Sequence, residues 1–152
     1  MTLHDQIEAD LREAMKTRDK ERTSALRMVI AQIRERAVAD GLSPQGRLDD
    51  KTVEKVVATE LKRRKEAATA FRDAGREASA ASEEADAAIY ESYLPEQLSD
   101  EELAAIVDDA IAEVGAEDPK QLGLVMKTAM GRVAGRADGS RVSAIARARL
   151  GS

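Results

Sequence analysis

The chain has 152 residues and a net charge of −5, with 35% charged and only 2% aromatic side chains. This composition favours helices, because strands prefer aromatic and β-branched residues. The absence of cysteine excludes disulfides and cysteine-based metal sites, and it fits a reducing cytoplasm. No apolar run approaches the roughly 20 residues of a membrane span, and residues 1–5 show no secretion signal. We therefore expect a cytoplasmic, all-α protein that does not cross a membrane.

Two helices are predicted before the first chain break. Thr2 and Asp5 form a capping box for a helix that ends near Thr17. A second helix is expected from about 21 to 39, before Gly41 and Pro44 interrupt the chain. The apolar positions predicted to be buried are Leu3, Ile7, Leu11 and Met15 in the first helix and Leu26, Val29, Ile30, Ile33 and Ala37 in the second.

Two further helices complete a predicted domain of residues 1–94. Asp49 or Asp50 caps a long third helix that Gly75 ends. A fourth helix is expected to start at Ser79 or Ser82 and to end before Pro95. The apolar face of the third helix comprises Val53, Val56, Val57, Leu61, Ala68 and Phe71.

Three short helices are predicted after a proline-marked joint at residues 94–98. Ser99 and Glu102 form a capping box for the first, which Gly115 closes. Asp118 caps the second, and Pro119 opens it. The third starts at Ser140, after a glycine-rich stretch at residues 131–139. The sequence thus predicts a four-helix N-terminal domain, residues 1–94, and a small basic three-helix domain, residues 95–152.

The charge is unevenly distributed along the chain. Residues 119–152 contain seven basic residues and one acidic residue, a charge of +6, and the other 118 residues carry −11. A basic end on an acidic body favours a polyanion as partner. The alternative is a helix surface that is basic only for solubility.

The segment from Gly131 to Arg141 is the best candidate for that contact. Its glycines bring backbone amides close to a ligand, and a helix that starts near Ser140 offers its positive end to an anion. Arg132, Arg136 and Arg141 suit phosphate, and helical spacing can place Lys127 near Arg132 and Arg136 if the chain stays helical that far. The alternative is an ordinary helix end and turn. The segment has no aromatic residue for stacking single-stranded bases, so a folded RNA fits better than a single strand.

Other candidate sites favour structural interpretations. His4, the only histidine, is expected on the surface rather than in a metal or catalytic site. The basic run 62–65 points around a helix axis rather than to one side, which favours a solvated surface over a nucleic-acid patch. The adjacent acids of residues 101–102 and 108–109 also diverge on a helix, so they do not form a catalytic carboxylate pair. We find no metal motif and no nucleotide-binding loop in the sequence.

The sequence resembles the GatB/YqeY family over nearly its whole length. The segments that carry the resemblance are residues 11–16, LREAMK; residues 26–30, LRMVI; residues 93–103, YLPEQLSDEEL; and residues 123–126, GLVM, leading into residues 135–139, GRADG. The resemblance implies a helical domain followed by a small three-helix unit, similar to the C-terminal tail of the GatB component of the bacterial glutamyl/aspartyl-tRNA amidotransferase. It also implies tRNA as ligand and marks Lys127, Arg132, Gly135, Arg136, Asp138, Gly139 and Arg141 for contact or architecture.

Three functions follow as expectations. The first is a non-catalytic, tRNA-binding or tRNA-associated module without metal or cofactor, with RNA contacts at Lys127, Arg132, Gly135, Arg136, Gly139 and Arg141. The second is an adaptor that binds a protein partner. The third is an accessory role in the carbon–nitrogen ligase activity, with glutamine as amido-N-donor, that the family is often assigned. Glutamine hydrolysis needs an activated nucleophile, and we identify no catalytic residue for it here.

Overall fold

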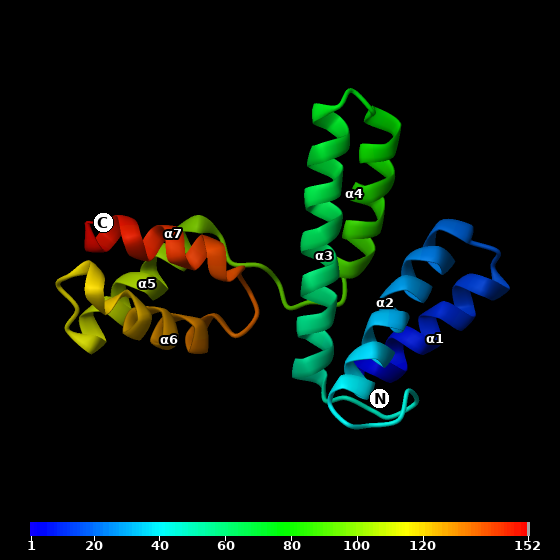
Figure 1. Cartoon of the computed structure of the whole chain (residues 1–152), viewed down its shortest axis with the longest axis horizontal. Helices are drawn as coiled ribbons and strands as arrows, with labels where there is room; N and C mark the ends of the chain where they lie inside the picture. Colours follow the sequence, from blue (N-terminus) through cyan, green and yellow to red (C-terminus); the bar gives the residue numbers. More distant parts are fainter. Residues whose placement is uncertain (152) are drawn as a thin grey trace. The chain divides into compact units, whose positions relative to one another are not determined.

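The protein is all-α. The computed structural model describes residues 1–151, which form seven α-helices and one short 3-10 helix and contain no strand (Figure 1). Backbone contacts divide the chain into two compact units, Met1–Leu94 and Pro95–Ser152, and each unit has its own buried cluster. That each unit folds as an independent domain stays a prediction.

The first unit consists of four helices. They are α1 (Leu3–Lys16), α2 (Lys20–Ala39), α3 (Asp50–Asp73) and α4 (Glu77–Glu91). The predicted capping box at Thr2 and the cap at Asp49 are both confirmed. α3 and α4 lie side by side as an antiparallel hairpin, which Figure 1 shows in green.

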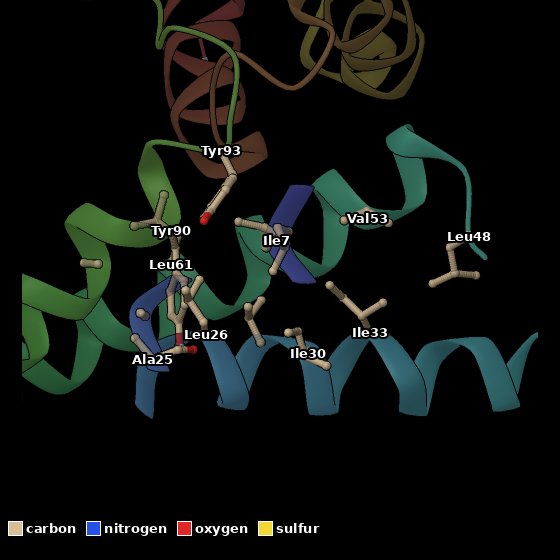
Figure 2. Close-up of a cluster of buried hydrophobic side chains, with 14 of the residues drawn as sticks. Ile7, Ala25, Leu26, Ile30, Ile33, Leu48, Val53, Leu61, Tyr90 and Tyr93 are labelled. Carbon is tan, nitrogen blue, oxygen red and sulfur yellow. The ribbon is translucent and has the colours of Figure 1, made fainter. Parts of the chain in front are cut away.

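The core of the first unit lies between α1, α2 and the part of the α3–α4 hairpin that contains residues 53–61 and 87–90. Tyr90 is fully buried there, and its hydroxyl donates a hydrogen bond of 2.7 Å to the carbonyl oxygen of Ala25 (Figure 2). Burial raises the pKa of Tyr90. Tyr93 donates to Asp10 at 2.5 Å, so the two tyrosines fasten the end of α4 to α2 and α1. The predicted core positions of α2 are all buried.

Three expectations for the first unit are wrong. Met15 is 49% exposed and Ala14 is buried in its place, because a strict spacing of four drifts by about 40° per step around a helix. α4 begins at Glu77 rather than at a serine, because the hairpin turn returns the chain to helix directly after Gly75, whose φ is +76°. His4 is buried with 1% exposure, because α1 turns it inward toward Arg47 and Glu8.

The second unit is a bundle of three helices. They are α5 (Asp100–Val114), α6 (Leu122–Val133) and α7 (Gly139–Leu150), with a 3-10 turn at Pro119–Gln121 before α6. The predicted capping box at Ser99 and Glu102 is confirmed, whereas Asp118 caps the 3-10 turn and not α6, which begins without a side-chain cap. The three helices pack around a cluster that includes Leu98, Leu103, Val107, Val125, Ala129, Val133, Val142, Ala146 and Leu150.

Helix boundaries in the second unit differ from the expectations by a few residues. Pro119 opens the 3-10 turn rather than the α-helix itself. α6 continues through Gly131 to Val133, because Val133 is fully buried and holds the last turn on the core. α7 starts at Gly139, since Asp138 rather than Ser140 is its N-cap.

Candidate nucleic-acid interface

The basic segment folds against an acidic one. Within the second unit, all seven basic residues lie between positions 120 and 149, and nine of its ten acidic residues lie between 96 and 118. The unit therefore carries −3, although residues 119–152 alone carry +6. Because α5 holds most of the acids, the unit has an acidic α5 side and a basic side on α6 and α7. Its field at a distance is weaker than the segment charge suggests.

Acids of α5 form ion pairs with three arginines of the other two helices. Arg132 pairs with Glu113, and Arg149 pairs with Asp108 at 2.9 Å. Arg141 pairs with Asp100, at the first turn of α5, at 2.7 Å. These arginines stay between 37% and 48% exposed, so the pairs are screened by solvent and add little stability individually.

Arg136 closes the end of α6. Its guanidinium donates to the carbonyl oxygens of Val133 at 3.0 Å and Arg132 at 2.9 Å, which are two of the acceptors that a helix end leaves open. The chain reaches this position through two consecutive left-handed residues, Ala134 with φ +50° and Gly135 with φ +81°. Gly135 is therefore required by the turn geometry.

The backbone of Leu98 is held from both sides by the predicted site residues. Its amide donates to the carbonyl oxygen of Arg136 at 2.8 Å, and its carbonyl oxygen accepts from the Arg141 guanidinium at 3.1 Å. Leu98 is itself buried in the core of the unit. Arg136 and Arg141 thus fix the segment that leads into α5. No local sequence pattern signals this clamp, because its partners lie about 40 residues apart.

The N-terminus of α7 is already capped by a carboxylate. The Asp138 side chain accepts from the Ser140 amide at 3.0 Å. Gly139 is the first residue of the helix, and a Cβ added there meets only the Met130 methyl at 3.8 Å. A phosphate at this helix end would approach beside a negative charge. The basic face of α6 is the better place for an anion.

Lys127 lies at the centre of the exposed face of α6. Gly123 and Gly131 stand four residues before and after it, so the three share one side of the helix. Apart from the adjoining residues and backbone of α6 itself, no atom lies within 4 Å of a Cβ added at either glycine. Within residues 1–151, Lys127 and Lys120, which are both exposed, form no ion pair. The structure thus presents two unpaired ammonium groups, and the surface around Lys127 is unobstructed.

The two arginines of the run at 62–65 are held within the first unit. Arg63 pairs with Glu60 at 2.8 Å, and Arg64 pairs with Glu83 at 3.1 Å. Lys62 and Lys65 remain exposed to solvent on α3. This arrangement supports the interpretation as a solvated surface.

His4 belongs to a charged cluster at the start of α1. Its Nε2 lies 3.0 Å from Nη1 of Arg47 and 3.3 Å from Glu8. Burial and the adjacent Arg47 lower the pKa of His4, although Glu8 opposes the shift. The neutral ring accepts from Arg47, which anchors the loop before α3 on α1.

Metal sites and membrane spans are both absent from the described part of the chain. Residues 1–151 hold no group of three or more His, Cys, Asp or Glu side chains that could bind a metal ion. None of the helices there is long and apolar enough to cross a membrane.

The fold and the site define a class of protein. It is all-α, and its C-terminal unit packs one acidic helix, α5, against two helices that carry basic residues, α6 and α7. The chain belongs to the family of YqeY-like proteins, whose model matches residues 4–150. No curated protein matches the chain. The predicted family is thereby confirmed, and the resemblance to the amidotransferase tail stays a prediction.

Proposed function

We propose that the protein is a non-catalytic, tRNA-associated binding module that uses the α6–α7 side of its second unit. The proposal depends on the separation of charge within this unit. The basic residues gather on α6, α7 and the turn before α6, while α5 holds most of the acids. A phosphate backbone can meet Lys120 and Lys127 there without displacing an ion pair with α5.

The roles of the predicted residues divide into contact and support. Lys120 and Lys127 have free ammonium groups for phosphate, and Arg132 keeps 41% of its side chain exposed beside its pair with Glu113. Gly123 and Gly131 leave room for a backbone to come close to Lys127. We assign Gly135, Arg136 and Arg141 to architecture first, because their conformations and hydrogen bonds hold the turn and the entry segment.

The proposal is tested by replacing both free lysines. The double variant Lys120→Ala/Lys127→Ala should bind deacylated tRNA more weakly than the wild type and to a similar degree for different tRNAs, because phosphate contacts carry no sequence information. The readout is the dissociation constant from fluorescence anisotropy. Lys16→Ala/Lys20→Ala in the first unit is the matched control, since both lysines are exposed and the charge change is equal. Equal binding by both double variants would contradict the proposal.

An adaptor role is the second candidate. Its specific support is the negative net charge of the protein. The second unit carries a net charge of −3 and the whole chain one of −5, and such charges repel nucleic acid at long range. Crosslinking in cells separates the two functions. Crosslinked tRNA supports the module, and a protein partner that survives nuclease treatment supports the adaptor. Release of ammonia from glutamine by the purified protein would instead support an amide-transfer role.

A further inference from the structure

The α3–α4 hairpin of the first unit carries a shallow groove. It is lined on the α3 side by Lys65, Ala68 and Thr69 and on the α4 side by Glu84, Ala87, Ala88 and Glu91. Ala68 and Ala87 are buried at its floor with 3% and 5% exposure, whereas Ala88 and Thr69 are exposed. The groove is thus floored by small side chains and flanked by charged ones, and a helix can lie close to such a surface.

The two walls of the groove carry opposite charges. Arg72 of α3 and Glu84 of α4 form an ion pair at 2.5 Å, so these two residues lie at the same level of the antiparallel hairpin. Lys65 is seven residues before Arg72 and Glu91 is seven residues after Glu84, so Lys65 and Glu91 also lie level with each other. Both of these side chains are exposed, and neither forms an ion pair within residues 1–151. Other charges of the hairpin, at Arg63, Arg64 and Arg72, are already paired. Lys65 and Glu91 are therefore available to an outside partner.

This charge pattern is complementary to itself. A twofold axis parallel to the helices places α3 of one copy over α4 of the other, because the rotation exchanges the two sides of the hairpin. Lys65 of each copy then faces Glu91 of the other copy, and the alanine floors meet between them. An axis across the helices would instead place Lys65 opposite Lys65. We propose that the hairpin groove is the interface of a homodimer with its twofold axis along α3 and α4.

The size of the face limits the strength of the dimer. α4 has 15 residues and is about 22 Å long, and two helices side by side are about 20 Å wide. The contact therefore covers at most about 450 Å² per copy, roughly half of what a stable interface buries on each partner. A weak dimer that forms only at high concentration follows, and salt should weaken it because its ion pairs are exposed to solvent.

Charge reversal tests this interface in the full-length chain. Sedimentation velocity over a concentration series should show a monomer–dimer equilibrium for the wild type. Lys65→Glu or Glu91→Lys alone should raise the dissociation constant about tenfold, since each places like charges together twice. The double variant Lys65→Glu/Glu91→Lys should restore the wild-type value, because both pairs form again with the charges exchanged.

The matched control is Lys51→Glu, which changes the same residue type on the same helix about four turns away from Lys65 and outside the groove. It should leave the dissociation constant unchanged. Circular dichroism checks that each variant keeps its helix content. A wild type that stays monomeric at millimolar concentration would overturn the inference. So would a dimer that tolerates Lys65→Glu or a double variant that fails to recover. These outcomes are independent of tRNA binding, because the groove lies in the first unit.

Discussion

At the scale of single residues, His4 shows how burial changes what a side chain does. As the only histidine of the chain it is the one side chain with an ordinary pKa near 6.5. Burial disfavours the charged ring, and the adjacent Arg47 guanidinium disfavours it further, while Glu8 opposes both effects on the pKa. The folded state thus disfavours the imidazolium, and the pKa of His4 lies below its value in the unfolded chain.

This lowered pKa predicts a loss of stability in mild acid. The unfolded chain binds a proton at His4 more readily than the folded chain does. The contribution of neutral His4 to the free energy of unfolding is therefore complete above pH 6.5, and it is lost as the pH falls through the lower pKa of His4 in the folded state. The free energy of unfolding should therefore fall from pH 7 to pH 5, by at most about 1.4 kcal/mol per pH unit from this group.

The control for this effect is His4→Gln, which removes the titrating ring and keeps an acceptor for Arg47. Urea denaturation at several pH values gives both stability profiles. Acids elsewhere contribute equally to the two proteins, so the difference isolates His4. Parallel profiles between pH 7 and pH 5 would show that the pKa of His4 is the same in the folded and unfolded states.

At the scale of helices, the chain leaves α6 through two consecutive left-handed residues, of which only Ala134 is strained. Ala134 has φ +50°, a conformation that costs a residue with a Cβ about 1–2 kcal/mol, and Gly135 follows with the same handedness. Arg136 then folds back onto the last carbonyl groups. The turn is strained at Ala134 and held in place by the guanidinium.

The variant Ala134→Gly should stabilise the protein. Glycine removes the strain but loses more conformational entropy on folding, so the net gain is at most about 1 kcal/mol. Thermal unfolding followed by circular dichroism measures it. The same substitution at Ala148, exposed inside α7, should instead destabilise by about 1 kcal/mol. A loss of stability in Ala134→Gly would show that the left-handed position is not strained.

Local signals explain which parts of the fold are predictable. The caps at Thr2, Asp49, Ser99 and Asp118 act on amides two or three residues away, so the sequence pattern identifies them. The inward turn of His4 and the clamp on Leu98 depend on residues about 40 positions distant. The basic character of residues 119–152 is plain from the sequence, but the pairing of its arginines with α5 needs the tertiary fold.

At the scale of the whole molecule, the first unit carries its own core. Its buried residues include Ile7, Leu26, Ile33, Val57 and Tyr90, all within residues 1–94. A fragment of residues 1–94 should therefore stay helical and unfold cooperatively on its own. Circular dichroism of the purified fragment checks this expectation. A fragment without helix content or without a cooperative transition would show that the first unit depends on residues 95–152.

The separation of charge in the second unit leads to the main proposal, that α6 and its preceding turn contact the phosphates of tRNA. The sharpest test is the salt dependence of tRNA binding for the wild type and for Lys120→Ala/Lys127→Ala. Each lost phosphate contact reduces the slope of log K against log salt by about one, so the double variant should lose about two. We expect this decrease in slope together with weaker binding. Identical slopes for the two proteins would contradict the proposal.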